Sequence, residues 1–352
     1  MKLAGHAPAL DGVRGAAALL VLAGHLGNRE LFLIPGVTHD LLGKPGVWLF
    51  FALSAFLLTG RLSDELERAP DSRGALAAYA IHRVFRIYPL YSLVIAAHWW
   101  LGDFTPRVAL RHLLLLAGWR ELWAIPAEFS YYLVIPFVAG FAARSGRVRA
   151  IQMLWVALAL AFLFNVGFPK YVFRDSGFIH GKLVPFFAGS LAGLLALERG
   201  EPAPTAWRRV ALPALAVAGF ALAAQGYRAL ALATSPLPDR LGIPGVSLAL
   251  GAFGALLISL SLEPSWLSRL MGSAPLAFFG RVSFSLYLWH EPIIRHVRAL
   301  ELSSGGPVAQ AWLYVTVCTL AAWLSYRAIE RPGMELGRRL GRALRKRALA
   351  VA

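Results

Sequence analysis

Hydrophobic residues occur in long blocks along this chain, and short polar or proline-rich segments separate the blocks. Blocks of about 20 mostly apolar residues are typical of helices that cross a membrane. The pattern predicts an all-α, polytopic membrane protein with about ten transmembrane helices. These helices are expected near residues 10–27, 46–60, 87–103, 123–143, 150–167, 178–197, 209–226, 243–262, 274–295 and 307–329.

The predicted helices follow one another without a long soluble stretch between them. The sequence therefore indicates one transmembrane domain over residues 1–335, followed by a basic cytoplasmic tail over residues 336–352. The tail contains RRLGRALRKR, for which two interpretations are open. It is either an amphipathic strip on anionic lipid or a solvated segment that fixes the topology.

Composition and charge support a membrane protein. Only 15% of the 352 residues are charged and 58% are hydrophobic, whereas a soluble domain has roughly a quarter charged residues. Cytoplasmic loops rich in Lys and Arg explain the net charge of +16, so nucleic acid is not expected as a partner. Lys and Arg number 21 on the side of the N-terminus and 12 on the opposite side, which predicts cytoplasmic termini. The single cysteine, Cys318, excludes an intrachain disulfide and a multi-cysteine metal site, and no metal is expected.

The first predicted helix, LDGVRGAAALLVLAGHLG, reaches spanning length only if it includes Asp11, Arg14 and His25. A charged group at membrane depth costs roughly 2.5–3.5 kcal/mol on insertion scales. Eleven residues separate Arg14 from His25, which is about 16 Å along a helix and within roughly 20° of the same direction. The two side chains therefore share a face, with Asp11 one turn before Arg14. We favour a functional polar stripe over an arginine that snorkels to the interface and an interfacial histidine.

Three further polar residues lie within apolar blocks. Glu128 follows Pro126, which limits regular helix and suits a cavity wall, and the predicted topology places it at the level of His25. The alternative is that Glu128 lies in a loop at the membrane interface. His290 is expected near the outer surface. There we favour a role in lining the membrane interface over a catalytic role. Ser54 is expected to bond a backbone carbonyl rather than to act as a nucleophile.

The stretch HRVFRIYPLY places Arg83 and Arg86 three residues apart, on one face at the start of a helix. Two guanidinium groups in this arrangement can bind phosphate bidentately, and Tyr88 follows close by. The alternative is that both arginines only anchor the helix at the cytoplasmic face. Glycine-rich phosphate motifs and GxSxG are absent from the sequence.

Taken in order, these stretches resemble the acyltransferase-3 family of integral membrane O-acyltransferases. The chain's LDGVRGAAALLVLAGHL is similar to LDGLRGxAAxxVxxxH, its GVWLFFALSAFLLT to GVxLFFVLSGFLIT, and its HRVFRIYPLY to RRxxRIYPxY. LWAIPAEFSYYLVIPF resembles WSLxxExxFYLxxP, with Trp123, Glu128 and Tyr132 in register, and LGRVSFSLYLWHEPII and YRAIERP resemble the closing motifs. Ala55 and Ala124 depart from the usual Gly and Ser, but neither departure removes a candidate catalytic group.

The resemblance implies ten core helices in the bacterial cytoplasmic membrane, an acyl-CoA donor on the cytoplasmic side and an acceptor hydroxyl outside. It implies acetyl-CoA as the donor and an essential role for Arg14 and His25. Family members acylate O-antigens, exopolysaccharides, nodulation factors and some macrolides, so the acceptor stays open between a glycan and a macrolide. Some members carry a secreted esterase-like domain, and this chain is expected either to finish the transfer itself or to need a separate extracytoplasmic partner.

The resulting hypothesis assigns the CoA phosphates to Arg83 and Arg86, with Tyr88 beside them. His25 acts as the general base on the acceptor hydroxyl, and an acyl-histidine relay is the second variant. Glu128 is expected to orient His25 or to stabilise its imidazolium. Arg14 contacts the donor or balances charge, and the supporting residues are Asp11, Ser54, Trp123, Tyr132 and His290.

A transporter or flippase is the rival from another class of protein. Broken helices and buried polar groups also suit carriers, although the sequence shows no inverted repeat.

Overall fold

The computed structural model describes residues 7–68, 72–169, 172, 179–198, 205–232, 242–297 and 306–351, and these residues contain helices and no strand. The all-α prediction is confirmed. The first half of the chain forms α1 (Pro8–Gly27), α2 (Gly43–Arg68), α3 (Ser72–Trp100), α4 (Pro106–Leu113), η1 (Arg120–Trp123), α5 (Ala124–Ser145) and α6 (Arg147–Gly167). The second half forms η2 (His180–Lys182), α8 (Leu183–Glu198), α9 (Ala206–Arg209), α10 (Ala211–Leu232), α11 (Gly242–Leu260), α12 (Trp266–Met271), α13 (Ala274–His296), α14 (Gly306–Ser325), η4 (Tyr326–Glu330) and α15 (Arg331–Val351).

Eight of the described helical segments are long and apolar enough to cross a membrane, and each overlaps a predicted span. Helices α3 and α13, with 29 and 23 residues, are long enough to cross a membrane, but they are not among these eight segments. These two helices carry the predicted polar residues at 83, 86 and 290. The chain is thus a multi-pass membrane protein, and the number of about ten spans stays a prediction.

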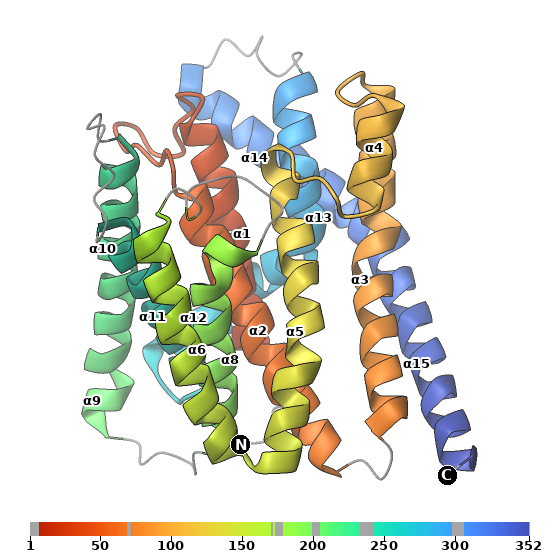
Figure 1. Cartoon of the computed structure of the whole chain (residues 1–352). Coiled ribbons are helices and arrows are strands. Elements are labelled where there is room, and N and C mark those ends of the chain that lie inside the picture. The colour runs from red at the N-terminus through yellow and green to blue at the C-terminus, as the bar shows by residue number, and fades with distance from the viewer. Residues whose placement is uncertain are drawn as a thin grey trace.

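The start of α1 and the end of α15 lie at the same end of the bundle (Figure 1). We call this the inner end, because the Lys and Arg bias predicts that it faces the cytoplasm. The opposite end is the outer end. Which face of the membrane each end meets stays a prediction.

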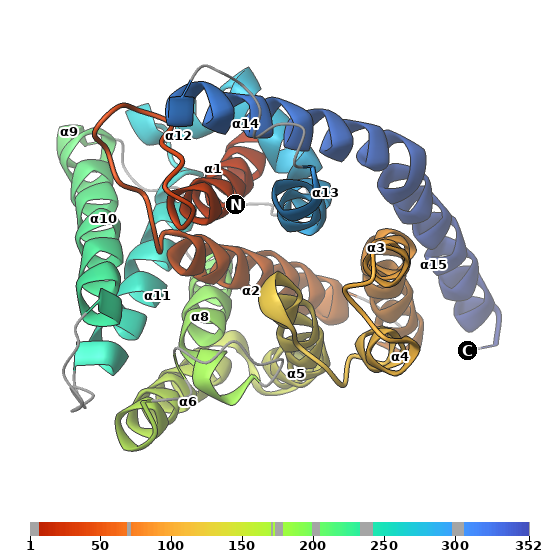
Figure 2. The same ribbon diagram turned by 90° about the horizontal axis from the view of Figure 1, so that it is seen from above.

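Helices α1 and α13 lie next to each other near the middle of the bundle (Figure 2). Glycines allow their backbones to approach closely. A Cβ atom added at Gly15 would lie 2.2 Å from the carbonyl oxygen of Leu276, and one at Gly280 would lie 1.8 Å from that of Asp11. Only a residue without a side chain fits at such a crossing. Gly15 of the opening LDGVRG motif therefore serves helix packing, and with Gly280 it fixes the register between α1 and α13.

Helix α2 packs against α1, α5 and α8 and forms the centre of the apolar core. Added Cβ atoms at Gly189 and Gly193 of α8 would lie 2.1 and 2.5 Å from carbonyl oxygens of α2. Phe186 stacks between Phe51 and Tyr131, with 4.3 Å between ring centroids on each side. This rigid packing places one face of α2 opposite α13.

The segment predicted as a basic tail is helical, and α14 continues through the π-helical turn η4 into α15 (Figure 1). Gly333, Gly337 and Gly341 lie four residues apart on the side of α15 that faces α3. A Cβ atom at Gly337 would lie 2.7 Å from the Cβ of Phe85, so the two helices are in close contact. Packing against α3 is a role that neither interpretation of the basic tail included.

The glycine contact between α1 and α13 gives a stability prediction. Gly280→Ala forces the two backbones apart, and overpacking of this kind costs typically about 1–3 kcal/mol. We expect a lower melting temperature of the purified protein in detergent, measured by intrinsic fluorescence. Gly140→Ala on α5 is the control, because a Cβ there meets no atom within 4 Å and alanine favours helix. Equal melting temperatures for the two variants would contradict this role of Gly280.

Candidate functional site

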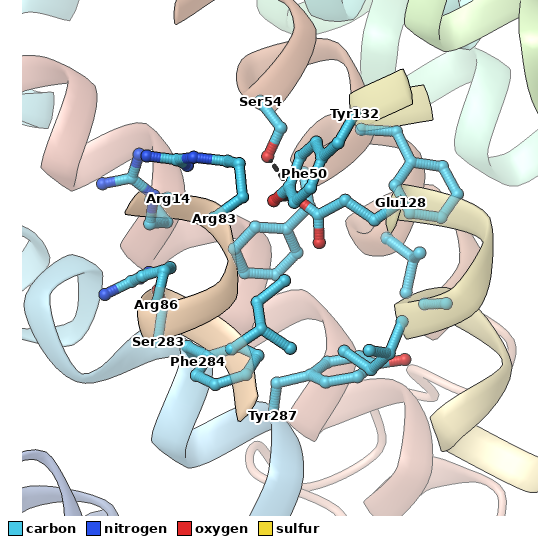
Figure 3. A pocket seen from close by; sticks show the side chains of 15 residues that line it. Arg14, Phe50, Ser54, Arg83, Arg86, Glu128, Tyr132, Ser283, Phe284 and Tyr287 are labelled. Carbon is cyan, nitrogen blue, oxygen red and sulfur yellow. Dashed lines mark hydrogen bonds between the residues drawn. The ribbon is translucent and has the colours of Figure 1, made fainter. Parts of the chain in front are cut away.

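A polar cavity of about 90 Å³ lies between α1, α2, α3, α5 and α13, and we call it the inner cavity. Figure 3 shows Arg14, Arg83 and Arg86 together on one side of it. Ser54 and Glu128 lie across the cavity from these arginines. Three cationic groups and one carboxylate among the lining residues leave an excess of positive charge. This composition suits an anionic ligand.

Arg83 and Arg86 point into the inner cavity from the middle of α3. The helix begins at Ser72, so the prediction that this pair stands at a helix start is wrong. Arg86 forms an ion pair with Glu330 of η4, which also accepts a hydrogen bond of 2.6 Å from Ser285. Arg83 has no ion-pair partner among the residues that the structure describes, and its buried Nε donates to none of them. Arg83 is therefore the guanidinium best placed to bind an anion.

Arg14 reaches the same cavity from α1 and donates a hydrogen bond of 3.0 Å to Asp11. The two residues are three apart on the helix, as the sequence pattern predicts. Asp11 thus offsets part of the charge that Arg14 brings into the bundle.

Glu128 accepts hydrogen bonds of 2.6 Å from Ser54 and 2.7 Å from Tyr132. The hydroxyl of Ser54 therefore bonds a carboxylate and not the expected backbone carbonyl. His25 lies against Gly43 at the start of α2, and Ser54 is eleven residues, about 16 Å, further along that helix. Glu128 is thus at a different depth from His25, and its predicted role of orienting His25 does not fit the structure.

A second cavity of about 450 Å³ lies nearer the outer end, and we call it the outer cavity. Its lining includes His25, Arg29 and Glu291. Nδ1 of His25 lies 3.4 Å from Oε2 of Glu291. Arg29 donates to both oxygens of that carboxylate, at 2.9 and 3.0 Å, and Arg295 donates to Oε1 at 3.3 Å. The carboxylate beside His25 is therefore held in place by two guanidinium groups.

His290 contacts His25 edge to face, with 4.7 Å between ring centroids. Its Nδ1 donates to the carbonyl oxygen of Tyr287 at 2.7 Å, so the lone pair is on Nε2. This Nε2 is buried and has no hydrogen-bond partner in the described part of the chain. His290 is only 1% exposed, so the expectation that it lines the outer interface is wrong.

Further charged residues hold the ends of α3 and α13 together. Asp103, just after α3, accepts hydrogen bonds from His98 at 2.7 Å, His296 at 2.9 Å and Arg295 at 3.2 Å. Burial alone would raise the pKa of Asp103. The hydrogen bonds from His98 and His296 and the charge of Arg295 outweigh burial and hold that pKa below its usual value.

Sequence reasoning missed Arg29, Glu121 and Glu291 as site residues. Arg29 falls in the loop between the predicted spans 10–27 and 46–60, and Glu291 falls near the outer end of the predicted span 274–295. The ion pair between them joins positions 262 residues apart, and no local spacing reveals such a pair. The one signal was the motif LWHEPII, whose Glu291 directly follows His290.

The remaining predicted residues divide between the two cavities. Tyr132 lines the inner cavity, whereas Trp123 lines the outer cavity and packs edge-on against Phe51. Tyr88 donates to the carbonyl oxygen of Leu113, the last residue of α4, at 3.2 Å. It is not part of the inner-cavity lining, and the structure does not bring it together with the arginine pair.

His25, His290 and Glu291 have potential ligand atoms within 4.8 Å of one another, a spacing that suits a metal ion. Both oxygens of Glu291 already accept hydrogen bonds from Arg29, however. A divalent cation would have to displace a guanidinium group and then lie beside it. The donor set therefore suits an ion-pair network around His25 better than a metal centre.

Comparison with known proteins settles the family. The sequence model of acyltransferase-3 proteins, described as an acyltransferase domain, matches residues 8–327. The chain belongs to the acyltransferase-3 family. This confirms the resemblance found in the sequence motifs.

The chain is similar to two curated bacterial proteins. The O-acetyltransferase OatA of Staphylococcus aureus is 25% identical over 363 residues, which cover 93% of this chain and 57% of the relative. The peptidoglycan O-acetyltransferase OatA of Listeria monocytogenes is 23% identical over 373 residues, which cover 93% and 56%. The chain thus spans little more than half the length of these relatives. No solved structure matches the chain significantly.

Proposed function

We propose that this protein is an O-acyltransferase that moves an acetyl group from acetyl-CoA at the inner end to a glycan hydroxyl at the outer end of the bundle. The observation that carries the proposal is that α1 lines both cavities. Arg14 faces the inner cavity and His25 faces the outer one, about 16 Å apart along the helix. Membership of the acyltransferase-3 family favours an enzyme over a transporter.

The inner cavity is the donor site in this proposal. Its arginines bind phosphate oxygens of CoA, with Arg83 as the main contact because Arg86 is already paired with Glu330. A cavity of about 90 Å³ cannot enclose a whole CoA molecule. The nucleotide part therefore stays at the inner mouth, and the extended pantetheine arm carries the thioester toward His25.

His25 is the general base in this proposal. Glu291 faces Nδ1 and favours the tautomer with the proton on that nitrogen, which leaves the lone pair on Nε2. Nε2 takes the proton of the acceptor hydroxyl while the hydroxyl oxygen attacks the thioester carbonyl carbon. The C–O bond forms, the C–S bond breaks, and the CoA thiolate takes the proton from the imidazolium. Glu291 stabilises that imidazolium, which is the role first predicted for Glu128.

An acyl-histidine relay is the second variant of this chemistry. Nε2 then attacks the thioester carbonyl carbon first, the C–S bond breaks, and the CoA thiolate takes the proton that the acyl-imidazolium releases from Nδ1. The acceptor hydroxyl attacks the resulting acyl-imidazole, the C–N bond breaks, and the hydroxyl proton returns to the imidazole. The same tautomer and the same Glu291 contact serve both variants.

The outer cavity is the acceptor site. It is five times larger than the inner cavity and is lined by Lys44, Arg120, Glu121 and the aromatic Trp123. Charged groups beside an aromatic ring can donate to and accept from sugar hydroxyls. The printed names of the relatives favour a glycan acceptor over a macrolide. We assign the protein to a bacterial cytoplasmic membrane, where acetyl-CoA reaches the inner end.

Variants of His25 and Glu291 test the chemistry. In detergent, with labelled acetyl-CoA and peptidoglycan fragments as acceptor, we expect His25→Ala to lose about 10²–10⁴-fold in kcat, as for removal of a general base. Glu291→Gln should lose kcat with the KM for acetyl-CoA unchanged. The control is His180→Ala, because His180 of η2 is not among the residues lining either cavity. Full turnover by a folded His25→Ala variant would refute the assignment.

A second prediction concerns the donor site. Arg83→Gln removes a charge-assisted contact worth about 1.5–3 kcal/mol, so we expect the KM for acetyl-CoA to rise about 10-fold or more with little change in kcat. Arg111→Gln on the short helix α4 is the matched control, since Arg111 lies outside the inner-cavity lining. An unchanged KM in the Arg83 variant would mean that the CoA phosphates bind elsewhere.

A further inference from the structure

The inner and outer cavities share two lining residues, Val47 of α2 and Tyr287 of α13. Phe50, one turn after Val47, lines the inner cavity and packs edge-on against Tyr287, with 6.4 Å between ring centroids. In Figure 3, Tyr287 lies at one end of the inner cavity, away from Ser54. One layer of side chains therefore separates the cavities. We call Val47, Phe50 and Tyr287 the partition.

The backbone on both sides of the partition is held firmly. Glycine contacts fix α13 against α1, and α2 packs into the apolar core. The Tyr287 hydroxyl donates a hydrogen bond to the carbonyl oxygen of Glu121, and its own carbonyl oxygen accepts one from His290. Val47 and Tyr287 are buried, whereas Phe50 is partly exposed. Side-chain rotation is therefore the smallest movement that opens the partition.

The two aromatic members differ in what their rotation costs. Rotation of Tyr287 breaks its hydrogen bond to Glu121, and a bond of this kind contributes about 0.5–1.5 kcal/mol net. Phe50 has no hydrogen bond to lose. Of the two rings, Phe50 therefore rotates more easily, and the hydrogen bond of Tyr287 keeps its ring in place.

We propose that the partition is the acyl-chain selectivity element of this enzyme. The inference rests on the proposed function, because it requires an acyl thioester to pass from the donor cavity to His25. Each added methylene on the acyl group must then displace ring atoms of Phe50 or Tyr287. A well-packed site discriminates by about 10–200-fold for one methylene. The partition thus admits acetyl and excludes longer acyl groups. The bonds that form and break in the transfer are those already described for His25.

The partition is tested by comparing kcat/KM for acetyl-CoA and butyryl-CoA with one acceptor. We expect Phe50→Ala to raise the butyryl-to-acetyl ratio at least 10-fold. Phe50→Leu should shift the ratio in the same direction by less, which covers the case that the alanine variant does not fold. Tyr287→Phe loses the hydrogen bond to Glu121 but keeps the ring. It should also change the butyryl-to-acetyl ratio by less than Phe50→Ala does.

Phe253→Ala is the matched control. Phe253 of α11 is a partly buried phenylalanine that packs against Gly219 and is not among the residues lining either cavity. It should leave the ratio unchanged. An unchanged ratio in folded Phe50→Ala and Phe50→Leu variants that still transfer acetyl would overturn the proposal. Absence of acetyl transfer by the wild-type protein would instead overturn the proposed function.

Discussion

The contact between α1 and α13 is the constraint on which the rest of the site depends. Gly15 and Gly280 bring the two backbones together, and the register of this contact decides which side chains meet. One consequence is that His25 of α1 lies beside His290 and Glu291 of α13. The same contact places Tyr287 at the boundary between the cavities. A helix pair held apart by ordinary side chains would not form this arrangement.

Within this frame, several buried charges pair with partners at the same end of the bundle. At the inner end, Arg86 pairs with Glu330 and Arg14 pairs with Asp11. At the outer end, Arg29 and Arg295 surround Glu291. An unpaired buried charge is strongly destabilising, so these pairs allow polar groups to lie inside a mostly apolar bundle. Arg83 lacks such a partner among the described residues, which is why it is the expected contact for an anionic donor.

Much of the site could be predicted from local sequence patterns. Helical geometry alone placed Asp11, Arg14 and His25 on one face of α1, and the three-residue spacing placed Arg83 and Arg86 on one face of α3. Contacts between distant segments could not be predicted in this way. The partner of His25 is Glu291 and not Glu128, because the register between helices decides it. The close packing of the basic C-terminal segment on α3 was missed for the same reason: its glycines at 333, 337 and 341 become informative only when the opposing helix is known.

In the proposed function, one protein carries an acyl group from the inner cavity to the outer cavity. Sealed proteoliposomes test it most directly, with labelled acetyl-CoA inside and a membrane-impermeant glycan outside. Protein molecules with the inner end facing the lumen should label the external glycan, and the His25→Ala variant should not. Labelling that occurs only when donor and glycan are on the same side of the membrane would show that the protein does not carry the acyl group across the bundle.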